Sequence, residues 1–125
     1  MKADLHNHSY YSDGVLSPGE LVRLARKAEC DLFSLTDHDT TDGIAEAQLE
    51  ADKIGLNLIN GVEISAFWKN MAIHIVGLGV DINNDILQAG LEHNKELRKI
   101  RAEKIALSLW RSGIKDVLDL SLIHI

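Results

Sequence analysis

The 125-residue sequence has one cysteine, one proline and no long apolar run, and each scarcity excludes a class of protein. Because Cys30 stands alone, no internal disulfide framework can form, which is typical of the reducing cytosol, and we expect a cytoplasmic protein. No apolar stretch approaches the 18 residues that indicate a membrane-spanning helix, so no membrane partner is expected. The first residues also lack the apolar segment of a secretory signal.

Positive charge is in the minority as well, because 13 Lys and Arg residues face 19 Asp and Glu residues for a net charge of −6. Proteins that coat DNA stably carry a net basic surface, so the acidic balance of this chain excludes that role. It does not exclude a nucleotide substrate that is held through bound cations. The hydrophobic fraction of 46% is typical of a globular domain that buries a core. Composition does not set the oligomeric state.

The order of the predicted elements indicates an α/β fold. Strands are expected at 3–8, 32–36, 56–64 and 72–78, and helices after Ser17, at 43–54 and at 85–111. Ser17 and Glu20 form a capping box around Pro18. Alternation of strand and helix predicts parallel strands with right-handed crossovers, in which polar residues at the carboxyl ends of strands form the site. The expected buried stripes are Leu21, Leu24, Ala25 and Ala28 in the first helix, Ile44, Ala47, Ala51 and Ile54 in the second, and Ile86, Leu97, Ile100, Ile105 and Leu109 in the third.

His6 and His8 are the strongest local signal. Two residues apart in a strand, they face the same side about 6.6 Å apart along the chain, so their imidazoles can converge on one metal ion. Asp4 can orient an imidazole from behind. The alternative is a pair of histidines on a solvated face.

Further polar residues follow the first two strands. Asp13 precedes Gly14 and could equally be a turn residue. His38 lies between Asp37 and Asp39, so a carboxylate is available to fix its tautomer and raise its basicity. The alternative for this group is a polar loop that leads into a helix N-terminus, where Asp is favoured by the dipole.

Two ionisable residues interrupt apolar strands. Glu63 follows Ile59–Val62, where an unpaired buried carboxylate is costly unless a metal ion compensates it. His74 lies inside the run from Ala72 to Val76. The alternative for Glu63 is a position on an edge strand that faces solvent. The alternative for His74 is a core or surface histidine whose hydrogen bonds are satisfied without a metal ion.

Two further features of the sequence, a basic segment and an aromatic pair, have structural explanations that we favour over functional ones. The basic residues of 95–104 alternate with Glu, as on a solvated helix face, although a phosphate contact is an alternative. Phe67 and Trp68 could stack on a base, but packing is the simpler explanation.

The candidate ligands together contain imidazole and carboxylate groups and no thiolate. Such a donor set suits Mn, Fe or Zn, and the number of groups suggests more than one ion. Multinuclear sites of this kind promote in-line phosphoryl displacement. The set comprises His6, His8, Asp13, His38, Glu63 and His74.

The motifs Asp4-Leu5-His6-Asn7-His8-Ser9, Ser12-Asp13-Gly14, Thr36-Asp37-His38-Asp39 and Gly61-Val62-Glu63 resemble, in order and spacing, the N-terminal half of the PHP (polymerase and histidinol phosphatase) family. After Glu63, the segments Ile64-Ser65, Trp68 and Ile73 to Leu78 look most like the branch of 5′–3′ exoribonucleases of the RNase AM type, which also act as nucleoside 3′,5′-bisphosphate phosphatases.

The resemblance implies the N-terminal half of a distorted (β/α)7 barrel with parallel strands and a trinuclear manganese-type site, with Zn2+ or Fe2+ as alternatives. It implies that His6 and His8 bind one ion. Glu63 would bridge that ion and a second ion, to which His74 also binds, and Asp13 and His38 would bind the third ion. Asp4, Asp37 and Asp39 would support these ligands. A metal-bound hydroxide would attack a phosphate ester of a nucleotide or short RNA.

The family pattern continues with a later His and an Asp-x-His, and neither occurs here, so six of nine expected protein ligands are present. We therefore expect a partial PHP domain at 1–119, inactive or very weak alone, and a non-native tail at 120–125 that looks like a translated sequencing adapter. Other readings are another PHP phosphatase, such as a histidinol phosphatase, or a non-catalytic metal-binding or interaction module.

Overall fold

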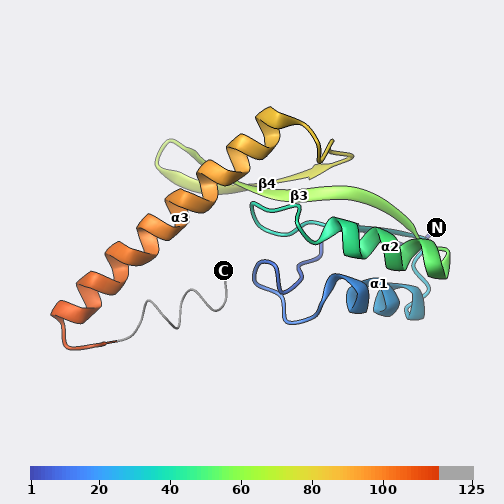
Figure 1. Cartoon of the computed structure of the whole chain (residues 1–125), viewed down its shortest axis with the longest axis horizontal. Helices are drawn as coiled ribbons and strands as arrows, with labels where there is room; N and C mark the ends of the chain where they lie inside the picture. The colour runs from blue at the N-terminus through green and yellow to red at the C-terminus, as the bar shows by residue number, and fades with distance from the viewer. Residues whose placement is uncertain (116–125) are drawn as a thin grey trace.

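A computed structural model of the chain describes residues 1–115 and has two helices beside a four-stranded sheet, with a third, long helix beyond it (Figure 1). The tail predicted at 120–125 lies outside these described residues. Within them, no helix is both long enough and apolar enough to cross a membrane. The elements are β1 (Ala3–Asp4), α1 (Pro18–Lys27), β2 (Leu32–Leu35), α2 (Ile44–Ile54), β3 (Asn57–Trp68), β4 (Met71–Leu78) and α3 (Asp85–Arg111).

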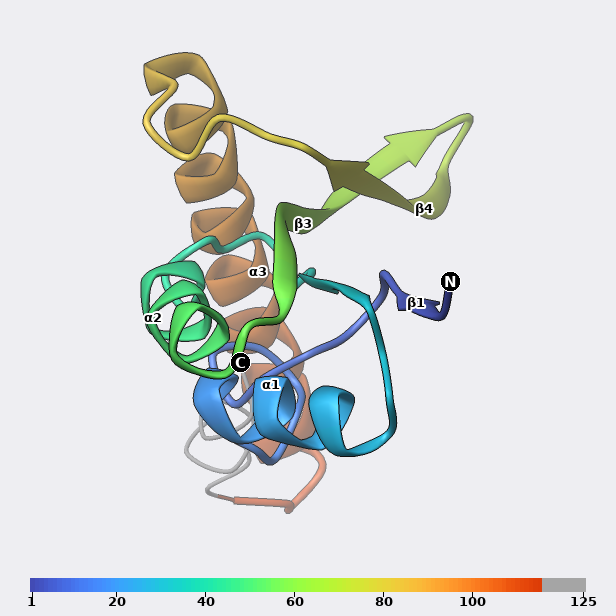
Figure 2. The same ribbon diagram turned by 90° about the vertical axis from the view of Figure 1, so that its right-hand side faces the viewer.

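The sheet has the order β1-β2-β3-β4, and its first three strands are parallel as predicted. The prediction of parallel strands throughout is wrong for β4, which runs antiparallel to β3. No helix separates these two strands, so no crossover can form, and Lys69 and Asn70 turn the chain with φ values of 47° and 62°. Two consecutive residues of positive φ are typical of a tight hairpin turn. Figure 2 shows β3 and β4 joined as this hairpin, which lies above β1 in that view.

Two strands differ in length from the prediction. β1 ends at Asp4, so His6 and His8 lie in the following loop. Asn7 still bonds to the neighbouring segment, because its carbonyl accepts from the Thr36 N–H at 2.8 Å. β3 continues to Trp68 because its second half pairs with β4 along the whole hairpin.

The core lies between the sheet and the α1–α2 pair, which lie side by side on the same side of β3 (Figure 1). The capping box forms as predicted, with Ser17 Oγ accepting from the Glu20 N–H and the Glu20 carboxylate accepting from the Ser17 N–H. The buried stripe of α2 is confirmed at Ile44, Ala47 and Ala51. The core cluster is Val22, Ala25, Cys30, Phe33, Leu35, Ala47, Ala51 and Leu56.

The stripe predicted for α1 is only partly right. Ala25 is buried and Leu21 packs against the core, but Leu24 is 51% exposed and Ala28 is exposed as well. Val22 is buried instead, because the inner face of α1 is centred on Pro18, Val22 and Ala25, at the i, i+4, i+7 spacing of a helix.

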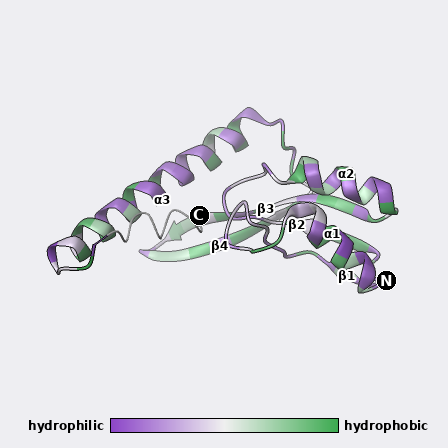
Figure 3. Cartoon of the chain, turned by 60° about the horizontal axis from the view of Figure 1, so that its bottom comes forward, coloured by the Kyte–Doolittle hydropathy of each residue, from purple (hydrophilic) through white to green (hydrophobic). Residues whose placement is uncertain are grey.

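The prediction of a buried stripe along α3 is wrong. Its 27 residues, about 40 Å of helix, lead away from the sheet (Figure 1), and only Leu91 is buried. Ile86 is 85% exposed and Leu97 is 47% exposed, because in residues 1–115 no other layer covers this helix. Figure 3 shows hydrophobic and hydrophilic residues alternating along α3, with hydrophobic residues prominent on β4.

Candidate metal centre

The loop from Leu5 to Ser17 carries three of the predicted site residues, and a buried carboxylate holds it in place. Asp37 is 1% exposed and accepts hydrogen bonds from the Ser9 N–H and Ser9 Oγ, both at 2.6 Å, and from Ser12 Oγ at 2.7 Å. Ser9 follows His8 and Ser12 precedes Asp13. The loop is therefore fixed next to two of its three site residues, His8 and Asp13.

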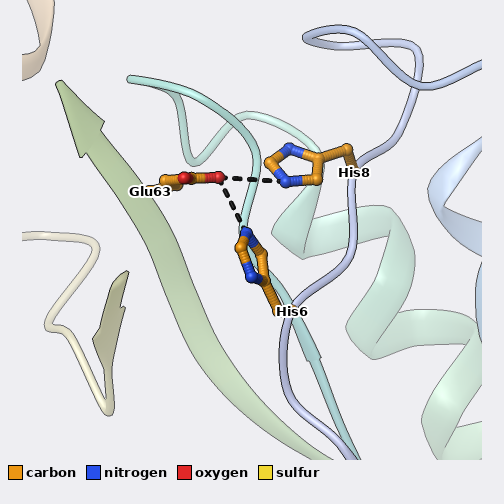
Figure 4. Close-up of side chains that lie close together, drawn as sticks. All are labelled: His6, His8 and Glu63. Atoms are coloured by element: carbon orange, nitrogen blue, oxygen red, sulfur yellow. Dashed lines mark hydrogen bonds and ion pairs between the residues drawn. The ribbon is translucent and has the colours of Figure 1, made fainter. Parts of the chain in front are cut away.

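His6 and His8 converge on Glu63, as Figure 4 shows. Nε2 of His6 lies 2.8 Å from Oε2 of Glu63, and Nε2 of His8 lies 3.0 Å from the same oxygen. The predicted convergence is therefore present, although a loop and not an alternating strand produces it. Glu63 is 6% exposed, in agreement with the prediction of a carboxylate buried in an apolar strand.

His38 reaches the same carboxylate because the β2–β3 register continues past the end of β2. The Glu63 N–H donates to the Asp37 carbonyl at 3.0 Å, and the Asp39 N–H donates to the Glu63 carbonyl at 2.9 Å. This isolated parallel bridge pairs His38 with Glu63. Nδ1 of His38 then lies 3.6 Å from Oε2 of Glu63.

Asp13 and His74 complete the cluster from two further directions. Asp13 lies between two imidazoles, with Oδ1 3.3 Å from Nδ1 of His8 and Oδ2 3.3 Å from Nε2 of His38. His74 comes from β4, and its Nδ1 lies 3.7 Å from Oε1 of Glu63. The structure thus brings all six candidate ligands together.

The six side chains form three overlapping groups in which the donor atoms lie within 4.8 Å of one another. Each group contains one carboxylate and shares one member with each of the other two groups. The groups are His6 with His8 and Glu63, His8 with Asp13 and His38, and His38 with Glu63 and His74.

The local electrostatics favour the ionisation states that a metal ligand needs. Burial lowers the pKa of His8 below its ordinary value, and the charges of His38 and His6 lower it further, against the opposing effect of Asp13 and Glu63. The His8 imidazole is therefore neutral, with a lone pair available, at neutral pH. Burial acts to raise the pKa of Glu63, but the hydrogen bond with His6 and the charges of nearby imidazoles hold this pKa below its ordinary value.

Two orphaned nitrogens test whether this arrangement fits metal ions. Nδ1 of His8 and Nδ1 of His38 are buried, yet neither has a hydrogen-bond partner of acceptable geometry among the described residues. Three imidazole nitrogens also crowd around Oε2 of Glu63, within 2.8 to 3.6 Å. Buried polar groups without partners are rare, and bound ions are one explanation for them. The nitrogen and oxygen donor set fits divalent metal ions.

The three carboxylates predicted to support the ligands are hydrogen-bonded to groups other than imidazoles. In residues 1–115, Asp4, Asp37 and Asp39 are not hydrogen-bonded to an imidazole. Asp4 accepts from Asn7 Nδ2 at 3.0 Å, and Asp37 holds the loop described above.

Asp39 takes part in a polar network that sequence reasoning missed. Its carboxylate accepts from Arg98 at 2.6 Å, from Ser65 Oγ at 2.6 Å and from Asn94 Nδ2 at 2.9 Å. Burial acts to raise its pKa, but the hydrogen bonds from Ser65 and Asn94 and the charge of Arg98 hold the pKa of Asp39 below its ordinary value. The spacing of Asn94 and Arg98, four residues apart on one helix, was the signal available in the sequence.

A cavity of about 550 Å³ adjoins the centre, between the β3–β4 hairpin and α3. Asp13, His38 and His74 form one side of it, so a molecule in this cavity could reach the cluster directly. The site therefore combines a multinuclear donor set with space for a small ligand.

Sequence comparison matches the chain to a known domain family and to parts of longer proteins. A model of the PHP domain matches residues 4–119. A 5′–3′ exoribonuclease of Haemophilus influenzae is 47% identical over 94% of this chain, and a 3′,5′-nucleoside bisphosphate phosphatase of Chromobacterium violaceum is 44% identical over 93%. These matches cover 43% and 41% of the two relatives, so the chain spans about two fifths of their length.

Solved structures agree with the sequence matches. An amidohydrolase structure from C. violaceum superposes with a TM-score of 0.88 at 43% identity, covering 95% of this chain and 42% of the other. A protein from Bifidobacterium adolescentis named as a metal-dependent phosphoesterase gives a TM-score of 0.83 at 31% identity, covering 88% of this chain and 38% of the other. The mixed α/β fold with its curled half-barrel sheet is therefore shared with larger proteins of this type.

Proposed function

The chain belongs to the PHP domain family, and from that premise we propose that its residues 1–119 are a partial PHP domain of a metal-dependent phosphoesterase. The observation that carries the proposal is the set of three overlapping donor groups, together with the orphaned Nδ1 atoms of His8 and His38. Its proposed substrates are nucleotides or short RNA, the classes named for the H. influenzae and C. violaceum relatives.

We propose that up to three divalent ions, Mn2+ first among the candidates, bind to the six clustered residues. His6, His8 and Glu63 would hold one ion, Glu63 and His74 with His38 a second, and Asp13 and His38 with His8 the third. The three groups overlap as this assignment requires. Zn2+ and Fe2+ are the alternative metals for such a donor set.

Bound ions of this kind activate water as a nucleophile and stabilise negative charge on phosphoryl oxygens. The chain's own residues prepare the site for that chemistry. Glu63 supplies a buried negative charge at the centre, and its lowered pKa keeps it ionised at neutral pH. Neutral His8 offers a lone pair, while Asp37 holds the loop that carries His8 and Asp13. The half-exposed His74 faces the cavity through which a phosphate ester can approach.

Metal counting is the direct test of the centre. After dialysis against Mn2+, the chain should retain two or three ions, and Glu63→Ala should lose more than one of them because Glu63 belongs to two groups. Glu103→Gln, at an exposed position of α3, is the matched control and should bind as the unaltered chain does. A chain that binds no transition metal would support the interaction-module alternative instead.

Substrate choice is tested with adenosine 3′,5′-bisphosphate beside histidinol phosphate. We expect any turnover to be slow, because the family pattern includes further ligands that this chain lacks. The proposal predicts Mn2+-dependent release of phosphate from the bisphosphate and none from Glu63→Ala. Preference for histidinol phosphate would favour the other PHP activity.

A further inference from the structure

The segment that carries His38 is joined to β3 by little backbone pairing. β2 ends at Leu35, and beyond it an isolated parallel bridge pairs His38 with Glu63. β3 itself has a second support at this point, because it pairs with β4 from Gly61 to Trp68. Of the two ligands, His38 is therefore the one whose position depends more on contacts made by side chains.

Asn94 on α3 makes such a contact to both sides of the bridge. Its Nδ2 donates to Oδ1 of Asp39 at 2.9 Å and to the carbonyl oxygen of Ser65, also at 2.9 Å. Asp39 directly follows His38, and Ser65 lies two residues beyond Glu63. The Ser65 N–H also donates to Oδ1 of Asp39, at 2.8 Å. One amide thus ties the segment after His38 to the strand after Glu63.

Arg98 spans the same two residues one turn further along α3. Its guanidinium donates to Oδ2 of Asp39 at 2.6 Å and to Oγ of Ser65 at 3.0 Å. Because Arg98 also supplies the charge that stabilises a buried carboxylate, its removal would disturb the fold and the site together. Asn94 is neutral, and its removal leaves the pair of Arg98 and Asp39 in place. Asn94 is therefore the residue at which an effect on the site can be separated from an effect on folding.

We propose that Asn94 is a positioning residue of the metal centre, which holds His38 in the place that two of the three donor groups require. The inference rests on the proposed function, because it concerns the ions that these groups would bind. The donor group that does not contain His38 is that of His6, His8 and Glu63. Residues that orient metal ligands typically change metal affinity by about 10- to 100-fold when they are lost.

The expected consequence is a selective loss of ions. Without the amide of Asn94, the segment after His38 can move away from β3, and both donor groups that contain His38 lose their geometry. Asp37, on the other side of His38, keeps its own hydrogen bonds to the loop that carries His6 and His8. A general defect in folding would weaken all three groups, so a selective loss distinguishes positioning from stability.

Asn94→Leu tests this by metal binding, without requiring turnover. Leu is close to Asn in shape and favours helix more strongly, so the substitution removes both hydrogen bonds without weakening α3 itself. At a Mn2+ concentration just sufficient to saturate the unaltered chain, we expect the variant to retain about one ion, because its affinity for the others falls about tenfold or more. Metal analysis after equilibrium dialysis gives the number of ions. Electron paramagnetic resonance should show an isolated Mn2+ ion in place of coupled ions.

Gln88→Leu is the matched control. Gln88 is another amide of α3 with two hydrogen bonds to the rest of the chain, since its Nε2 donates to Oγ1 of Thr41 at 3.0 Å and to the carbonyl oxygen of Ile82 at 2.7 Å. These bonds reach neither Asp39 nor Ser65. The control therefore loosens α3 without cutting the link across the bridge, and it should retain as many ions as the unaltered chain. Urea unfolding of the metal-free variants compares their stabilities.

Ser65→Ala is the second variant, and it decides the outcome where Asn94→Leu does not fold. It removes the hydroxyl that donates to Asp39 at 2.6 Å and should lose the same ions. The inference is overturned if the variant that folds retains every ion or loses all of them, or if Gln88→Leu loses the same ions. An unaltered chain that binds no transition metal contradicts the proposed function and the inference together, whereas unaltered binding by the variant contradicts the inference alone.

Discussion

At the scale of single residues, the candidate metal centre depends on a close backbone approach that leaves no room for a side chain at Gly14. The loop passes so close to itself at Gly14 that a Cβ there would lie 2.1 Å from the His8 carbonyl oxygen and 2.6 Å from the His8 carbonyl carbon. Both are backbone atoms of a candidate ligand and cannot turn aside. Gly14 thus adjoins one proposed ligand, Asp13, in sequence and another, His8, in space.

We predict that Gly14→Ala lowers Mn2+ affinity by about tenfold or more, because the His8 backbone must move to admit the methyl group. Calorimetric titration with Mn2+ measures the change. Gly90→Ala is the matched control, since a Cβ at Gly90 meets nothing within 4 Å. That control should leave Mn2+ affinity unchanged and stabilise α3 by about 0.5–1 kcal/mol. Unaltered Mn2+ binding by Gly14→Ala would contradict the role of this close approach.

At the scale of secondary-structure elements, α3 differs from α1 and α2 in how it is held. The first two helices bury apolar stripes, whereas α3 buries only Leu91. Its other contacts with the sheet side are polar, since Arg98 and Asn94 bond to Asp39 and Ser65. Asp39 has a φ of 52°, an uncommon conformation for a non-glycine residue, and follows His38 directly. The network thus links α3 to the metal centre.

We predict that Arg98→Met destabilises the chain by about 1–3 kcal/mol, because the buried Asp39 carboxylate loses a charged donor. Urea unfolding gives the free-energy change, and amide exchange should show the loss concentrated near residues 91–98 and 37–39. Lys99→Met, at an exposed neighbouring position, is the control and should change the unfolding free energy by less than about 0.5 kcal/mol. Equal effects of the two substitutions would show that the network does not hold α3.

The same network predicts a pH dependence. Hydrogen bonds and Arg98 hold the pKa of Asp39 below its ordinary value, so its ionised form stabilises the fold above the unfolded pKa of about 4. That stabilisation is lost as the pH falls through the lower, folded pKa. The unfolding free energy should therefore decrease between about pH 5 and pH 2. Asp39→Asn should flatten this decrease, although Glu63, whose pKa is also lowered, leaves a residual slope in the same window. An unchanged slope in the variant would contradict the assignment.

The features that the sequence predicted correctly are those that depend on residues close together in the chain. The capping box at Ser17 and the apolar stripe of α2 depend on residues within one helix, and both are present. The convergence on Glu63 was predictable because parallel strands end at one edge of the sheet. The direction of β4, the exposure of α3 and the bonding of Asp39 depend on partners distant in sequence, which local patterns do not encode.

At the scale of the whole molecule, the described chain has a covered side and an uncovered side. Helices α1 and α2 bury one side of the sheet, while β4 ends the sheet with no further strand paired to it in residues 1–115. Several large apolar side chains are exposed on this strand. They are Met71, Ile73, Ile75, Val76 and Leu78, with exposed fractions from 36% to 55%. An edge strand with free backbone groups and apolar side chains is a site for intermolecular pairing.

We predict that the 125-residue chain associates with itself through β4, which sedimentation velocity over a range of concentrations measures. Ile75→Lys should shift the distribution toward monomer, because a charged side chain on the edge strand opposes pairing with a second copy. Ile86→Lys is the matched control, since Ile86 is 85% exposed on α3, where the backbone groups are bonded within the helix, and it should leave association unchanged. A chain that stays monomeric at every concentration, or equal dispersal by both substitutions, would show that the β4 edge does not direct association.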